Sequence, residues 1–194
     1  MGAIHNFDIE EIKKTFNLEY LLETGTNEGD AIQYCMRYDF VKYFSVELLN
    51  NYYEICKKKF HLQDNVRLYL GDSITQLPIM LNDIPKERNI LFWMDAHLPS
   101  AYSSEYDNSN LDLAFPLEKE LLTIRKNRNT SKDYFIIDDL RIYDNECCYN
   151  GNAPTQHKHP TKNDINFIYD MFAETHNIIK DSRGEGYIII IPKK

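Results

Sequence analysis

The chain has 194 residues, of which 43% are hydrophobic and 27% charged, and its formal net charge at pH 7 is -8. This length suits one domain, spanning 1–194, with a core that needs no metal or disulfide to hold it. The negative charge argues against nucleic acid or an anionic membrane as a partner, and no apolar run reaches the roughly 20 residues of a membrane span. We therefore predict a soluble, cytoplasmic protein that binds neither nucleic acid nor membrane.

Short apolar segments alternate with longer amphipathic segments along the whole chain, which is typical of alternating strands and helices. The first helix is expected at 8–16, inside an N-terminal helical segment of residues 1–17. Further helices are predicted at 29–39, 49–60, 73–81, 115–127 and 163–173, and strands at 20–24, 43–48, 66–71, 89–95, 133–139, 176–181 and 186–192.

The last two predicted strands are separated only by "SRGEG", a turn with two glycines that favours an antiparallel hairpin. The other strands are separated by helices and are rich in Ile, Leu, Phe, Tyr and Val, as in parallel sheets that are buried on both faces. The predicted fold class is therefore α/β. It is a Rossmann-like, seven-stranded, mostly parallel sheet with helices on both faces and a C-terminal antiparallel hairpin.

Two long polar segments, 98–114 and 140–162, follow predicted strand C-termini, the edge of an open α/β sheet where ligands bind. Loops of this length are uncommon without a function or disorder. We predict that at least one of them binds the acceptor substrate or acts as a lid over the site. The alternative is that both are only mobile connecting loops. Tyrosines in these loops could stack on a sugar ring or simply pack, and they are Tyr102, Tyr106, Tyr143 and Tyr149.

The four cysteines are Cys35, Cys56, Cys147 and Cys148. They form no C-x-x-C pair and no evident disulfide framework, so we expect them to be reduced.

The turn after the first strand, "ETGTNEGD", contains Gly25 and Gly29, which let the backbone approach a ligand closely. It lacks the third glycine of the dinucleotide fingerprint. A pyrophosphate at this helix N-terminus would meet Glu28 and Asp30, with no Lys or Arg nearby to offset the repulsion. Asp30 alone could equally stabilise the positive N-terminal end of the helix dipole. Together with Glu23, these acids favour a ligand with a cationic or hydroxyl-rich end.

Two more polar sites follow at the ends of the next strands. Glu47 ends the second strand, 22 residues after Gly25, where an acid can accept hydrogen bonds from a ribose diol. The third strand ends in "LGDS", which offers Asp72 and Ser73. Alone, these two would more often cap a helix, but in series with Glu47 we predict that they contact a base edge.

The segments "LLETGTNEGD", "SVEL", "LGDS" and "FWMDAH" resemble, in order and spacing, the motifs of class I S-adenosylmethionine-dependent methyltransferases. The resemblance covers residues 18 to 192. Within that class the chain is most similar to the metal-dependent, macrocin-type sugar O-methyltransferases and the related cephalosporin hydroxylase-like group. The resemblance implies that S-adenosylmethionine, which carries an ammonium and a sulfonium but no phosphate, is the cofactor. The residues it implies for cofactor binding are Glu23, Thr24, Gly25, Thr26 and Gly29 at the methionine end, Glu47 at the ribose, Asp72 and Ser73 at the adenine, and Asp95.

The next two predicted strands end in "FWMDAH" and "FIIDDLR". In the usual sheet order of the class these strands are neighbours, so Asp95, Asp138 and Asp139 could converge and hold Mg²⁺ or another divalent cation. Such a metal would lower the pKa of an acceptor hydroxyl. His97 is the predicted general base beside Asp95. Otherwise it orients the acceptor or is simply a polar residue at the strand end. Consecutive aspartates often only begin a turn, and on a regular strand they would point to opposite faces.

The sequence thus predicts an S-adenosylmethionine-dependent O-methyltransferase that acts on a hydroxyl of a sugar or glycoside, assisted by a divalent metal. Its partner would be a small-molecule or glycan acceptor, and a homo-oligomer is left open. The alternatives are a catechol-type or other small-molecule O-methyltransferase, a nicotinamide oxidoreductase on the same layout, and a non-catalytic nucleoside-binding module that kept the fold.

Overall fold

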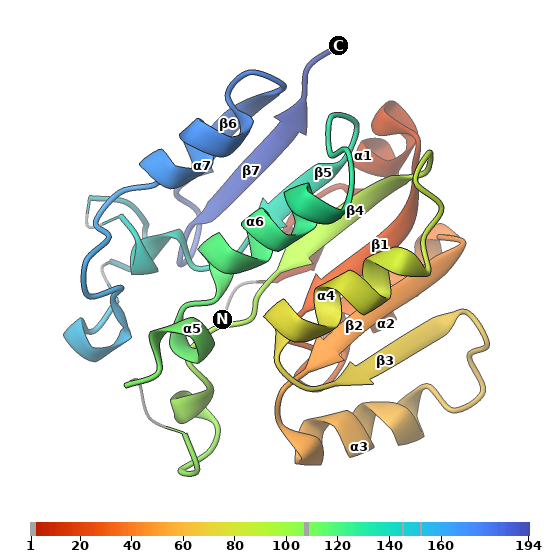
Figure 1. Ribbon diagram of the computed structural model, residues 1–194, viewed down its shortest axis with the longest axis horizontal. Coiled ribbons are helices and arrows are strands. Elements are labelled where there is room, and N and C mark those ends of the chain that lie inside the picture. The colour runs from red at the N-terminus through yellow and green to blue at the C-terminus, as the bar shows by residue number, and fades with distance from the viewer. Residues whose placement is uncertain (1–2, 107–108, 145, 152) are drawn as a thin grey trace.

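The computed structural model of the chain describes residues 3–106, 109–144, 146–151 and 153–194. Its centre is a seven-stranded sheet with the strand order β3-β2-β1-β4-β5-β7-β6 (Figure 1). Strands β1 to β5 run parallel to one another, and β7 runs antiparallel to both β5 and β6. The predicted fold class, including the C-terminal hairpin, is confirmed.

The strands are β1 (Leu18–Thr24), β2 (Lys42–Glu47), β3 (Val66–Leu70), β4 (Asn89–Met94), β5 (Tyr134–Ile137), β6 (His176–Asp181) and β7 (Tyr187–Pro192). The α-helices are α1 (Ile9–Phe16), α2 (Asp30–Cys35), α3 (Asn50–Lys59), α4 (Ser73–Asn82), α5 (Leu111–Ala114), α6 (Leu117–Asn127) and α7 (Asn166–Phe172). Within the described residues, the 3-10 helices are η1 (Ile4–Asn6), η2 (Met36–Tyr38), η3 (Pro99–Ala101), η4 (Leu140–Ile142) and η5 (Thr155–His157).

Helices cover both faces of the sheet, so the strands bury both of their sides. Helices α4, α6 and α7 lie on one face of the sheet (Figure 1). They pack onto side chains such as Phe92 and Phe135, whose rings stack at 4.5 Å. On the other face, α1, α2 and α3 pack around Leu21 and Trp93. This double burial explains the nearly continuous apolar sequence of β4, "NILFWM". The carboxyl ends of the parallel strands are left at one edge of the sheet, between the helix layers.

Two predicted elements are shorter than the sequence suggested. The helix predicted at 29–39 is α-helical only to Cys35, continues as a 3-10 turn, and stops where Asp39 adopts a left-handed conformation. The strand predicted at 133–139 ends at Ile137, because Asp139 is also left-handed, with φ 56°. The chain therefore bends before the two aspartates could continue the alternation of a strand.

The two predicted loops contain short helices. Segment 98–114 holds η3 and α5, and segment 140–162 holds η4 and η5. Residues 107, 108, 145 and 152 of these segments lie outside the described residues. None of the helices in the described part of the chain has the length and apolar character needed to cross a lipid bilayer.

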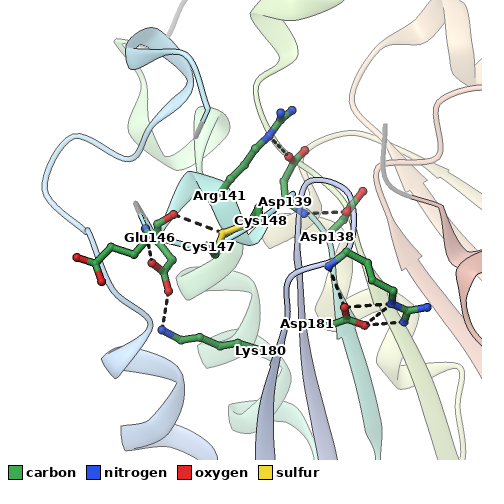
Figure 2. Close-up of a disulfide and its surroundings, with 10 residues drawn as sticks. Asp138, Asp139, Arg141, Glu146, Cys147, Cys148, Lys180 and Asp181 are labelled. Carbon is green, nitrogen blue, oxygen red and sulfur yellow. Dashed lines mark hydrogen bonds and ion pairs between the residues drawn. A yellow bond between two sulfur atoms is a disulfide. The ribbon is translucent and has the colours of Figure 1, made fainter. Parts of the chain in front are cut away.

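The expectation that all four cysteines are reduced is wrong for one pair, because the structure joins Cys147 to Cys148 in a disulfide (Figure 2). Cys148 has φ 85°, a turn that lets two adjacent side chains meet, and a sequence count of cysteine spacings does not detect it. Cys35 and Cys56 are free and buried. A Cβ on Gly186 would lie 2.4 Å from the Cys148 sulfur, so the disulfide packs closely on the turn between β6 and β7.

Candidate functional site

A cavity of about 610 Å³ opens at the carboxyl ends of the parallel strands, where the sequence placed the site. Its wall includes residues that directly end or follow β1, β2, β3, β4 and β5. The predicted site residues that line it are Glu23, Gly25, Thr26, Glu47, Asp72, Ser73, Asp95, His97, Asp138 and Asp139. Two predicted cofactor residues, Thr24 and Gly29, do not line it.

The wall of the cavity is strongly acidic. Eight of its residues are carboxylic acids, and among the described residues that line it none is Lys or Arg. A cavity of one charge with low-dielectric walls attracts ligands of the opposite charge and repels those of the same charge. This wall therefore favours a cation over a diphosphate. The acids are Glu23, Glu28, Asp30, Glu47, Asp72, Asp95, Asp138 and Asp139.

Gly25 forms the floor of the turn after β1. Its φ is 82°, which L side chains rarely adopt, and a Cβ there would lie 2.6 Å from the backbone oxygen of Asp95. The amide of Gly25 donates to the carbonyl of Val46 at 3.0 Å and so continues the hydrogen bonding between β1 and β2. Only glycine lets the ends of β1 and β4 approach this closely, so the tight turn has a steric cause.

Glu23, at the end of β1, is only 1% exposed and is held by a chain of hydroxyl groups. Ser45 donates to its Oε2 at 2.5 Å, and the hydroxyls of Thr26 and Ser45 lie 2.6 Å apart. Burial raises the pKa of the Glu23 carboxyl to about 8, although the Ser45 hydroxyl lowers it. A buried acid with a raised pKa beside a cavity is typical of a functional site.

Glu47 ends β2 and is 6% exposed, with both of its oxygens fixed by the backbone. The amide of Asn27 donates to Oε2 at 2.7 Å and that of Leu49 donates to Oε1 at 2.8 Å. Burial raises the pKa of the Glu47 carboxyl, although the hydrogen bonds from these backbone amides lower it. Each oxygen keeps a further lone pair, so the carboxylate can still accept hydrogen bonds from a ligand in the cavity.

Asp72 both lines the cavity and caps α4, because its Oδ1 accepts from the amide of Ile74 at 3.0 Å. The helix-capping role of Asp72 is confirmed, and its contact with a base edge stays a prediction. Gly29 serves packing, since a Cβ there would lie 2.6 Å from the ring of Phe60. Thr24 is fully buried behind the wall. Neither Thr24 nor Gly29 presents a side chain to a ligand in the cavity.

The prediction that no basic residue is near the acidic turn is wrong. Lys59, at the end of α3, lies 2.9 Å from Oδ1 of Asp30 and donates to the backbone oxygen of Glu28 at 2.8 Å. It is 29 residues from Asp30 in the chain, and the packing of α3 on α2 brings them together. Asp30 is mostly exposed, so this pair moderates the charge at the mouth of the cavity.

His97 lies between two of the predicted acids. Its Nε2 lies 2.8 Å from Oδ2 of Asp139, and its Nδ1 lies 3.6 Å from Oδ1 of Asp95. The other oxygen of Asp139 accepts from Nε of Arg141 at 2.8 Å (Figure 2). Arg141 also donates from its second nitrogen to Oε1 of Glu185 at 2.8 Å. Both oxygens of Asp139 are therefore held by nitrogen donors.

Charge and burial shift the pKa of each group in this cluster. Burial alone would lower the pKa of His97. The hydrogen bond to Asp139 and the negative charges of the neighbouring carboxylates have a larger effect and raise this pKa to about 9. Burial and the charge of Asp138 raise the pKa of Asp95, and burial with the charge of Asp139 raises that of Asp138 to about 7. Near neutral pH, His97 is a cation that donates hydrogen bonds.

The bend after β5 brings Asp95, Asp138 and Asp139 to the same cavity, as the sequence predicted. Three oxygen donors with excess negative charge are the donor set that Mg²⁺ prefers. Within the described ranges, however, no group of three or more His, Cys, Asp or Glu side chains is arranged to hold a metal ion. Each oxygen of Asp139 is already held by one nitrogen donor, Nε2 of His97 or Nε of Arg141.

The sequence did not predict two parts of the wall. Ala3, Ile4 and His5 line the cavity, and their segment is tied down at Tyr187, whose hydroxyl accepts from the amide of Ala3 at 3.1 Å. No short motif identifies such a contact across 184 residues.

Tyr52 on α3 also lines the cavity, and its ring packs edge-on against that of Tyr102, 6.2 Å away. Tyr102, with Pro99 and Leu113, brings segment 98–114 to the wall, whereas the described part of 140–162 contributes no lining residue. Of the tyrosines singled out in the sequence, Tyr143 is buried in the core and Tyr149 is exposed.

Comparison with known proteins gives structural likeness without sequence likeness. No protein-family model matches the chain, and no curated protein matches it. A Staphylococcus aureus structure provisionally named a caffeoyl-CoA O-methyltransferase is 14% identical, with a TM-score of 0.61 over 100% of this chain and 85% of that one.

Two similar structures have bound ligands. The O-methyltransferase TomG of Streptomyces achromogenes, solved with S-adenosylmethionine, is 14% identical, with a TM-score of 0.60 over 95% of this chain and 78% of that one. An O-methyltransferase of Bacillus cereus, solved with S-adenosylhomocysteine, is 16% identical, with a TM-score of 0.56 over 95% and 78%. At these identities the likeness establishes the fold.

Proposed function

We propose that the protein is an S-adenosylmethionine-dependent O-methyltransferase. The observation that carries the proposal is the acidic cavity at the carboxyl ends of β1 to β5, which has eight carboxylic acids and no Lys or Arg among its described lining residues. S-adenosylmethionine supplies a methyl group on a positively charged sulfur and carries an ammonium group, so it suits this wall. The likeness of the fold to several O-methyltransferase structures supports the same conclusion.

The residues of the wall have distinct roles in this proposal. The tight turn at Gly25 leaves room for the amino-acid end of the cofactor, and Glu23 lies behind it as a buried carboxyl group whose pKa burial raises to about 8. Glu47, fixed by two backbone amides, accepts the ribose hydroxyls. Asp72 and Ser73 face the adenine side.

His97 and Asp95 are the proposed catalytic residues. Because the pKa of His97 is raised to about 9, its imidazole donates at neutral pH and holds the acceptor oxygen in line with the methyl group. This favours the orienting role over the general-base role for His97. Asp95, whose pKa is also raised, lies beside it and is placed to take the proton of the acceptor hydroxyl.

We propose a sugar or glycoside hydroxyl as the acceptor, with a phenolic hydroxyl as the second candidate. Either ring could lie against Tyr52 and Tyr102, two aromatic residues that line the cavity and pack edge-on against each other. The name of the Staphylococcus aureus structure is the specific observation in favour of a phenol. A divalent metal remains a separate part of the proposal, in which Asp95 and Asp138 would hold it together with Asp139 once His97 and Arg141 release that carboxylate.

The test is transfer of a labelled methyl group from S-adenosylmethionine to a panel of sugars, glycosides and catechols, with and without a chelator. The proposal predicts a labelled product that is lost in Glu47→Ala and retained in Glu10→Gln, a matched change of an exposed acid on α1. Binding of cofactor without product across the panel would favour a non-catalytic module. Loss of product on chelation would support the metal, and unchanged turnover would remove it.

A further inference from the structure

S-adenosylmethionine carries one group that an acidic wall does not suit. Its methionine end has a carboxylate beside the ammonium, and eight carboxylic acids line the cavity. Like charges repel each other more strongly in a site of low dielectric constant, so an unpaired carboxylate there would weaken binding. The cofactor therefore needs a hydrogen-bond donor or a cation for this carboxylate.

His5 is the donor that the wall offers for this purpose. Among the described lining residues there is no Lys or Arg, and the side chains that can become cationic are those of His5 and His97. His97 is already engaged, because it lies 2.8 Å from Asp139 and 3.6 Å from Asp95. The side chain of His5 is exposed, and its imidazole can donate an N–H to a carboxylate in either tautomer.

The position of His5 agrees with this role. Its helix, η1, packs against α2, and α2 begins at Asp30, directly after the glycine turn. The ring centroid of His5 lies 6.0 Å from that of Tyr34 on α2, and both side chains line the cavity together with Asp30 and Ala31. The resemblance of the sequence implies that the glycine turn takes the methionine end of the cofactor, so His5 lies at the end where the carboxylate would be.

The residues on both sides of His5 are anchored, which fixes the place that its ring can reach. The Tyr187 hydroxyl accepts from the amide of Ala3 at 3.1 Å and from Nδ2 of Asn6 at 2.8 Å. Phe7 is buried and packs edge-on against the ring of Tyr187, with 4.9 Å between the centroids. A side chain on an anchored segment has less conformational freedom to lose on binding, so more of its interaction with a ligand appears as affinity.

We propose that His5 is a cofactor-binding residue, whose imidazole donates a hydrogen bond to the carboxylate of S-adenosylmethionine. The acids of the glycine turn face the ammonium of the same methionine end. This end of the cavity thus matches both charges of an amino acid, although most of the wall carries only one sign. The inference rests on the proposed function, because it takes S-adenosylmethionine to be the ligand.

The experiment is calorimetric titration with two ligands that differ only in this carboxylate, S-adenosylmethionine and decarboxylated S-adenosylmethionine. The proteins are the wild type, His5→Ala, His5→Gln and the control His61→Ala, which changes an exposed histidine that is not among the lining residues. We expect His5→Ala to raise the Kd of S-adenosylmethionine roughly tenfold and that of the decarboxylated ligand less than about twofold, because only the first loses a hydrogen bond to a charged group. His5→Gln keeps an N–H donor and should lie nearer to the wild type than His5→Ala does, and His61→Ala should match the wild type.

Other roles for His5 give different patterns. An equal rise in the Kd of both ligands in His5→Ala means that the residue only shapes the wall, and no rise means that the carboxylate binds elsewhere; either result overturns the inference. Lys59, which is paired with Asp30 at the mouth of the cavity, is the rival partner. A selective tenfold loss in Lys59→Ala, with His5→Ala unchanged, would assign the carboxylate to that lysine.

The two ligands also separate this inference from the proposed function. A wild type that binds neither ligand removes the proposed function and the inference together. A wild type that binds S-adenosylmethionine leaves the proposed function standing, and the His5 variants then decide the inference alone.

Discussion

Glu23→Gln should remove a large part of the pH dependence of folding. The pKa of Glu23 is about 8 in the folded protein, against the ordinary value of 4.5 for a glutamate in the unfolded chain. Below pH 4.5 both states hold the proton, so its contribution to stability is fully present there. Above pH 4.5 the unfolded chain releases the proton first, and stability falls until the pH passes 8.

The size of the effect follows from the shift. One pKa unit corresponds to about 1.4 kcal/mol, so a shift of 3.5 units costs the wild type about 5 kcal/mol of unfolding free energy between pH 4 and pH 9. Glutamine has no proton to lose and can still bond to Ser45. The stability of Glu23→Gln relative to the wild type should therefore rise by a few kcal/mol over this range.

Urea unfolding at several pH values measures this directly. The only tryptophan, Trp93, is buried opposite Glu23 in the register of β1 with β4, so its fluorescence reports on this site. Glu10→Gln should give a curve parallel to that of the wild type. If Glu23→Gln also stays parallel to the wild type from pH 4 to pH 9, then Glu23 is not a buried acid with a raised pKa, and the acidic cavity is misjudged.

Three further predictions concern other parts of the site. Gly25→Ala should lower stability by about 1–3 kcal/mol and weaken cofactor binding, because its φ is 82° and a Cβ meets the backbone; thermal unfolding near wild-type Tm would contradict this. The pKa of His97, about 9, should fall in Asp139→Asn when its ring signals are titrated by NMR, and an unchanged value would mean that the pair is not formed. Denatured protein should show two thiols before reduction and four after it, and four before reduction would exclude the Cys147–Cys148 disulfide.

The sheet and the acids at its edge could be predicted because each depends on the pattern of apolar and polar residues over a few neighbouring positions. Apolar runs between amphipathic segments predicted all seven strands, and "SRGEG" predicted the hairpin. Parallel strands place their carboxyl ends at one edge, so acids that end successive strands, such as Glu23, Glu47 and Asp95, had to lie together.

The parts that sequence reasoning missed depend on contacts between distant residues. Lys59 reaches Asp30 only because α3 packs beside α2, and Tyr187 holds the N-terminal segment over the cavity. Gly29 belongs to packing against Phe60, which a count of glycines does not distinguish from a ligand-binding turn.

Some of the missed features did leave a signal in the sequence. Glu120 falls on the apolar face of "LEKELLTI", three residues after Leu117 and four before Ile124, where a charge is out of place. The metal set is the opposite case. Three aspartates were correctly placed on one rim, yet the sequence did not show that His97 and Arg141 would take both oxygens of Asp139.

Calorimetric titration of the purified chain with S-adenosylmethionine, S-adenosylhomocysteine and NADH tests the central claim most directly. The acidic cavity predicts saturable binding of both sulfur compounds at micromolar concentration, weakened at least tenfold in Glu47→Ala, and no heat with NADH. Binding of NADH in place of the sulfur compounds, or no heat from either at high micromolar concentration, would contradict the account.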